Sequence, residues 1–122
     1  MELRISKNQP YMKDAYRVNC NDPDGDNLTG VICSNLKYQK SDSLLTVIYN
    51  KLLAMEETDS TRDYIIQLQK EWRAFRDKHC GILGGRYKEG LGHFNGIIYL
   101  EFLTELTDHR RKELESLLEM GY

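Results

Sequence analysis

The chain has 122 residues, 40% of them hydrophobic and 30% charged, a length and composition that fit one compact domain spanning residues 1–122 and disfavour a second. Its 17 basic and 19 acidic residues leave a formal net charge of -2, which provides no broad positive field for nucleic acid. No apolar run reaches the roughly 18 to 20 residues of a membrane span, so none is expected.

Residues 1 to about 26 show no sustained helical period. They contain both prolines, Pro10 and Pro23, and a turn-rich run from Asn21 to Asn27. We therefore expect an irregular arm packed onto the rest of the domain. The first residues lack the apolar core and cleavage site of a secretory signal. Either the protein is cytosolic, or this is a mature form whose leader was replaced by a start methionine.

A first long helix is predicted over about residues 28–57, with Asn27 or Thr29 as its N-cap. A second is predicted over 60–80, where Ser60 and Asp63 have the spacing of a capping box. Both predictions depend on apolar side chains that recur at helical spacing, namely Tyr38, Leu45, Tyr49, Leu52 and Leu53 in the first and Ile65, Leu68, Trp72 and Phe75 in the second.

Glycine-rich sequence from Gly81 to Gly92 is expected to end the second helix and to form an exposed loop. A third helix is then predicted over about residues 93–119. Its apolar positions are Phe94, Ile97, Ile98, Leu103, Leu106, Leu114, Leu117 and Leu118. The fold class is therefore all-α, with three long antiparallel helices in a small bundle and an irregular N-terminal arm.

Each predicted helix also places a charged group on its apolar face. A helical projection puts Asp42, Arg76 and Arg110 among core residues, with Gln69 and Thr107 nearby. An unpaired buried charge is costly, whereas an arginine fork satisfies a carboxylate with two hydrogen bonds. We therefore expect these five residues to form one buried polar cluster. With no nucleophile among them, a structural role in helix register is favoured over an active centre.

Three cysteines are present, so at least one thiol stays unpaired in a monomer. Cys20 lies in the predicted arm and Cys33 in the first turns of the first helix. A disulfide between these two would pin the arm to the bundle and leave Cys80 free. Such a bridge favours an oxidising compartment, and hence a periplasmic or secreted protein whose signal peptide has been removed.

The second predicted helix carries a spaced pattern that resembles the signature of the LprI family, L-x-x-x-Q-x-x-W-x-x-x-R-D-x-x-C. Its positions here are Ile65, Gln69, Trp72, Arg76, Asp77 and Cys80. The surrounding order is also similar over roughly residues 20 to 118, through Cys20, Ile32, Cys33, Asp42, Tyr49, Gly84, Gly85, Thr107, Arg110 and Leu114. Family members often have a fourth cysteine where this chain has Phe102, which agrees with an unpaired Cys80.

The resemblance implies a secreted or lipid-anchored bacterial domain, and lysozyme inhibition is known for one member. We therefore expect a non-catalytic envelope protein that binds lysozyme or another cell-wall hydrolase and occludes it, with Arg86 and Tyr87 as a candidate contact loop. Alternatives are an immunity protein to a secreted toxin, or a structural helical module of the envelope. The sequence does not predict the oligomeric state.

Metal sites and cofactors are not expected. The acidic run after Asn21 resembles a calcium loop, but with Gly25 at its sixth position the first and twelfth fall on Cys20 and Val31. His79, Cys80 and His93 lack the spacing of a zinc site. Catalysis by Cys80 with either histidine is also disfavoured, because a thiol near a helix C-terminus lacks the positive surroundings that lower its pKa.

Overall fold

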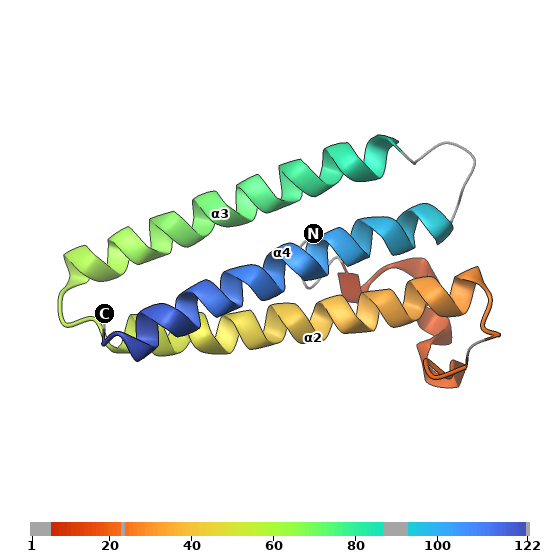
Figure 1. Cartoon of the computed structure of the whole chain (residues 1–122), viewed down its shortest axis with the longest axis horizontal. Helices are drawn as coiled ribbons and strands as arrows, with labels where there is room; N and C mark the ends of the chain where they lie inside the picture. Colours follow the sequence, from red (N-terminus) through yellow and green to blue (C-terminus); the bar gives the residue numbers. More distant parts are fainter. Residues whose placement is uncertain (1–5, 23, 87–92, 122) are drawn as a thin grey trace.

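The computed structural model describes residues 6–22, 24–86 and 93–121, and of residues 82–86 and 93–95 it describes the backbone only. Its elements are the 3₁₀ helix η1 (Pro10–Arg17) and the long helices α2 (Asn27–Ala54), α3 (Asp59–Arg86) and α4 (His93–Glu119) (Figure 1). The described residues contain no strand, which confirms the all-α prediction. At 28, 28 and 27 residues, each long helix extends for about 40 Å.

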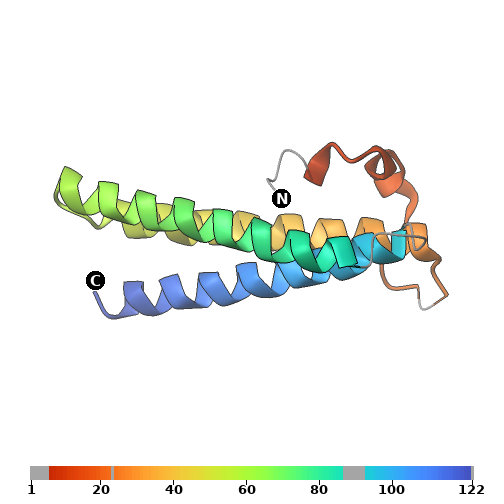
Figure 2. The ribbon, with the colours of Figure 1, turned by 90° about the horizontal axis from the view of Figure 1, so that it is seen from above.

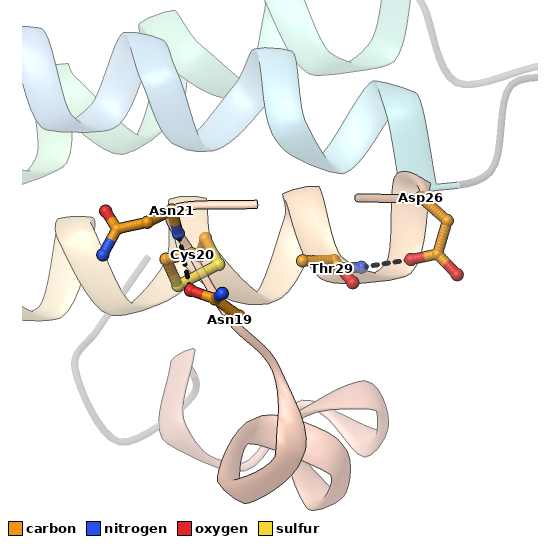
Figure 3. Close-up of a disulfide and its surroundings, with 6 residues drawn as sticks. Asn19, Cys20, Asn21, Asp26 and Thr29 are labelled. Atoms are coloured by element: carbon orange, nitrogen blue, oxygen red, sulfur yellow. Dashed lines mark hydrogen bonds between the residues drawn. A yellow bond between two sulfur atoms is a disulfide. The ribbon is translucent and has the colours of Figure 1, made fainter. Parts of the chain in front are cut away.

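Helix α2 begins one residue earlier than predicted, because Asp26 supplies its N-cap. The Asp26 carboxylate accepts a hydrogen bond from the backbone N–H of Thr29 at 2.8 Å (Figure 3), so neither Asn27 nor Thr29 is the cap. The helix ends at Ala54 rather than near residue 57, where the backbone N–H of Met55 bonds to the carbonyl of Leu52 at 3.2 Å.

Helix α3 begins at Asp59 and is capped by Thr58, whose hydroxyl accepts from the backbone N–H of Thr61 at 3.2 Å. The predicted capping box of Ser60 and Asp63 is therefore wrong. The prediction that glycines stop this helix near Cys80 is also wrong, because α3 continues to Arg86. Glycine weakens a helix by only about 1 kcal/mol relative to alanine, and Gly81 lies in α3 without a positive φ.

The three long helices run up, down and up along one axis (Figures 1 and 2). Helix α3 is antiparallel to both others, whereas α2 and α4 are parallel and share the most extensive contact. Glycines permit their close approach near their N-terminal ends. A Cβ at Gly30 would lie 2.8 Å from Ile97 Cδ1, and one at Gly96 would lie 2.9 Å from Val31 Cγ2. No helix among the described residues is long and apolar enough to cross a membrane.

In the part of the chain that the structure describes, two apolar clusters form the core. The first lies toward the N-terminal ends of α2 and α4 and includes Tyr38, Cys80 and Leu103, with Phe102 packed against it. The second lies toward the other end and includes Leu45, Leu52 and Leu114, with Trp72 packed against it. The buried polar residues predicted from the sequence belong to the stretch of the bundle where these clusters meet.

The N-terminal arm contains the helix η1, where the sequence predicted irregular structure. Pro10 stands in its first turn, where the missing N–H costs no hydrogen bond. The arm is fixed by the predicted disulfide between Cys20 and Cys33, whose Cα atoms lie 5.7 Å apart (Figure 3). Side chains of η1, Tyr11 among them, pack against the first apolar cluster.

Candidate functional site

Arg76 is the centre of the polar contacts between helices. Its side chain is only 1% exposed, and its Nη1 donates to Asp42 Oδ1 of α2 at 3.2 Å and to Thr107 Oγ1 of α4 at 3.3 Å. Its Nε donates to Asp77 Oδ1 at 2.9 Å. The structure therefore brings Asp42, Arg76 and Thr107 together, one from each long helix, as the helical projection predicted.

Arg110 was expected to contact Asp42, but it does not. Its Nε donates to Gln69 Oε1 at 3.2 Å, and its Nη1 donates to Glu113 Oε2 at 3.2 Å. The indole of Trp72 connects the two groups, because the guanidinium carbons of Arg76 and Arg110 lie 5.2 and 5.7 Å from the centroid of its ring. The expected single cluster is thus two groups of polar contacts, one around Arg76 and one around Arg110, that share one aromatic ring.

Two members of these contacts were missed by sequence reasoning. Arg73 donates to Asp42 Oδ1 at 3.1 Å, and Asp77 accepts from Arg76. The sequence could have identified both residues. Arg73 lies close to the face of Gln69 and Arg76 on a helical projection, and Asp77 directly follows Arg76 in the R-D pair of the family-like motif. Asp42 therefore has two cationic partners rather than one.

A second buried polar network was also missed, at the N-terminal arm. The amide of Asn35 donates to the carbonyl of Ser6 at 3.0 Å and to the Tyr11 hydroxyl at 2.9 Å. Its Oδ1 accepts from the Ser6 hydroxyl and from Gln39 Nε2, the latter at 2.7 Å. Asn35 is fully buried on the same face of α2 as Val31 and Tyr38. That position on the helix was the signal that could have identified it.

Burial affects the pKa values of Tyr38 and Arg76. Burial raises the pKa of Tyr38, whose ring lies against the Arg76 guanidinium. Burial disfavours the charged form of Arg76, but Tyr38, Asp77 and Asp42 outweigh that effect and raise the pKa of Arg76. Arg76 therefore stays cationic, and its role is to hold three helices rather than to exchange a proton.

Cys80 is a free thiol within the first apolar cluster, fully buried, and burial raises the pKa of its thiol. His79 points elsewhere, since its ring stacks on Phe75 with centroids 5.5 Å apart. Across residues 6–22, 24–86 and 93–121, no group of three or more histidine, cysteine or acidic side chains is placed to hold a metal. The side chains of Arg86, Tyr87 and His93 lie outside the described part, and with them the predicted contact loop.

An open, acidic groove lies between α2 and α4 beside the disulfide, with a volume of about 500 Å³. Carboxylates of α4 dominate its charge: Glu101 and Glu105 are exposed, and Asp108 accepts a hydrogen bond from Ser41. Lys37 of α2 supplies the basic side chain. The remaining lining residues are Cys20, Cys33, Ser34 and Thr104. Such a groove suits a basic protein surface.

Comparison with protein families finds one match, to a family described as "Lysozyme inhibitor LprI", over residues 20–114. This span contains the disulfide, the contacts of Arg76 and Arg110, and the acidic groove. The comparisons with curated proteins and with solved structures found no match.

Proposed function

The chain belongs to the LprI family of lysozyme inhibitors, and we propose that it is a non-catalytic envelope protein that binds and occludes lysozyme or a related peptidoglycan hydrolase. The family match over most of the chain is the observation that carries this proposal. The Cys20–Cys33 disulfide favours a periplasmic or secreted location, because such bonds persist in oxidising compartments.

Burial of the polar residues that join the helices supports a binding rather than a catalytic role. Asp42 and Arg76 have side chains that are 4% and 1% exposed, so a polymeric substrate has no access to them. Cys80 is buried as well, and its raised thiol pKa opposes formation of the nucleophilic thiolate. These residues maintain the shape of the domain, and its surface makes the contact with the target.

We place that contact surface at the acidic groove beside the disulfide. Glu101 and Glu105 are exposed on one face of α4, one helical turn apart, and Asp108 extends the same face. A basic hydrolase such as lysozyme would meet complementary charge there. Electrostatic complementarity of this kind speeds association and weakens as salt screens it.

The test is hydrolysis of bacterial cell walls by lysozyme in the presence of the full chain. We expect inhibition at micromolar excess, weaker inhibition by the double variant Glu101→Gln/Glu105→Gln, and a further loss as salt is raised. The control Glu57→Gln removes an exposed carboxylate from the α2–α3 connection and should inhibit like the wild type. Absence of any protection by the wild-type chain would refute lysozyme as the target.

Two outcomes of this assay distinguish the choice of target from the choice of contact surface. If the wild type inhibits but the double variant inhibits equally well, the proposed function stands and the acidic groove is not the contact surface. If binding of hydrolases is absent altogether, the chain is better described as a structural module or as an immunity protein for another secreted effector.

A further inference from the structure

A second groove lies at the opposite end of the bundle from the disulfide, where α2 ends, α3 begins and α4 ends. Its volume is about 310 Å³, within the lower range of small-molecule sites, which is roughly 300 to 1,000 Å³. Apolar and aromatic side chains form most of its lining, which consists of Tyr49, Leu52, Glu56, Thr61, Tyr64, Ile65, Leu68, Gln69, Arg110, Leu114 and Leu117.

Gln69 gives this groove an unusual polar group. The residue is only 4% exposed, and its Oε1 already accepts a hydrogen bond from Arg110 Nε, which fixes the orientation of the amide. Its Nε2 has no hydrogen-bond partner among the described residues. A buried donor without a partner is rare because its desolvation is not compensated. Neighbouring atoms cover this nitrogen, so a ligand with an acceptor atom at this end of the groove would satisfy it by displacing the side chains that cover it.

Arg110 adds positive charge beside that donor. Its side chain is 17% exposed, and its ion pair is with Glu113, which is 48% exposed and therefore well screened by solvent. The charge of Arg110 toward the groove is thus only partly compensated. A guanidinium next to an amide donor is the arrangement that recognises a carboxylate.

The shape of the groove defines the rest of the ligand. From Gln69 back to Thr61 the groove follows about 12 Å of α3, and along this length Leu52, Leu114 and Leu117 face it from the other two helices. Among the described residues that line the groove, Glu56 is the carboxylate, and it belongs to the far end, near Thr61. An anionic head group is therefore favoured at the Gln69 end alone.

We propose that this groove binds a small aliphatic carboxylate, with its head group on Gln69 Nε2 and the Arg110 guanidinium and its hydrocarbon chain along the leucines. This binding activity is independent of the proposed inhibition of lysozyme. The ligand is a free small molecule of the short fatty-acid class, since the groove is too small for a folded partner.

Trp72 provides a direct readout. It is the single tryptophan of the chain, and its ring lies 5.7 Å from the guanidinium carbon of Arg110. The probe is octanoate, titrated below its micelle concentration into the full chain while Trp72 emission is followed. Octanol and octyltrimethylammonium carry the same tail with no charge and with the opposite charge. We expect saturable binding of octanoate, about tenfold or more tighter than that of octanol, and no saturable binding of the cation.

Variants test the head-group end and the apolar length of the groove separately. Gln69→Leu removes the amide donor and should reduce octanoate affinity toward that of octanol, while octanol binding stays unchanged. Leu117→Gln should weaken both ligands. The control Val47→Gln changes an exposed apolar residue on the outer face of α2, outside the groove, and should weaken neither. Equal affinity for octanoate and octanol, or equal losses in Leu117→Gln and Val47→Gln, would overturn the proposal, whatever the lysozyme assay shows.

Discussion

Arg76 is the largest side chain that is fully buried in the described part of the chain, and it shows why the polar core residues matter. Its guanidinium is satisfied by Asp42, Asp77 and Thr107 and lies against the rings of Tyr38 and Trp72. A buried charge of this kind tolerates only one arrangement of its partners. The expected effect is to fix the register of the three helices rather than to add net stability.

Loss of the Asp42 carboxylate tests this interpretation. In Asp42→Ala, Arg73 and Arg76 lose their shared partner, and we expect the free energy of unfolding to fall by about 3 kcal/mol, since the buried Arg76 then keeps only the partly exposed Asp77 as its carboxylate partner among the described residues. Urea denaturation measures it. The exposed pair of Asp59 with Arg62 is the control, and Asp59→Asn should cost less than about 1 kcal/mol. Equal, small losses in both variants would show that the buried arginine does not depend on the Asp42 carboxylate for compensation.

Burial of Tyr38 predicts a loss of stability in alkali. Its folded-state pKa lies above the unfolded value of 10.0 because burial disfavours the phenolate. Stability from this group is therefore complete below about pH 10 and is lost as pH rises toward the folded pKa, at up to about 1.4 kcal/mol per pH unit. Cys80 acts with the same sign above its ordinary value of 9.0.

Substitution separates the Tyr38 contribution from that of other groups. Tyr38→Phe should show a flatter decline of the free energy of unfolding between about pH 10 and pH 12 than the wild type. Tyr64→Phe, at an exposed position, serves as the control and should decline as the wild type does. An unchanged slope in Tyr38→Phe would show that the buried phenol does not limit alkaline stability.

At the scale of the elements, the apolar periodicity placed three long helices, but their ends depended on single side chains. Asp26 caps α2 one residue before the nearer predicted cap, and Thr58 caps α3 two residues before the predicted one. Several neighbouring residues in each segment have cap-forming side chains, so propensity alone does not select one. The C-terminal end of α3 was missed by more, because glycine favours a helix end but weakens a helix interior by only about 1 kcal/mol, which the rest of the helix can offset.

Gly81 offers a test of the longer α3. Its φ is not positive, and a Cβ there would meet no atom within 4 Å, so Gly81→Ala should raise the free energy of unfolding by about 0.5 to 1 kcal/mol through higher helix propensity. Gly121 is the contrasting control: with a φ of +70° after α4, its change to alanine should lower stability by about 1 kcal/mol. Thermal melts compare the three proteins. Destabilisation by Gly81→Ala would indicate that α3 ends at Cys80.

At the scale of the whole molecule, the packing of α2 against α4 and the packing of α3 against its neighbours have different causes. Gly30 and Gly96 let α2 approach α4 closely, whereas large side chains of α3, Trp72 and Arg76 among them, fill the space between α3 and its neighbours. This arrangement leaves grooves at both ends of the bundle, one acidic and one mainly apolar. The arm is held at the first end by the disulfide and by Asn35.

Removal of the disulfide should destabilise the domain without abolishing its helices. We expect Cys20→Ser/Cys33→Ser to lose about 3 kcal/mol, as the chain-entropy model gives for a loop of this size. Far-ultraviolet circular dichroism should stay near the wild-type spectrum, while amide exchange in η1 increases. Reductant should destabilise the wild type and leave the double variant unchanged. A response of that variant to reductant would show that another thiol reaction is involved.

The amino-acid sequence was enough to predict the helical class, the pairing of Cys20 with Cys33, and the inward direction of Gln69 and Arg76. The helical class and the inward direction follow from residue period and the cost of burying charge, and the pairing follows from the short separation of the two cysteines along the chain. All of these are local or pairwise properties. Tertiary structure alone decided that Arg110 bonds to Gln69 instead of Asp42, that Asn35 holds the arm, and that grooves open at both ends. These contacts and grooves depend on the distance and relative rotation of the helices. Side-chain volumes determine that distance and rotation only when the whole bundle packs.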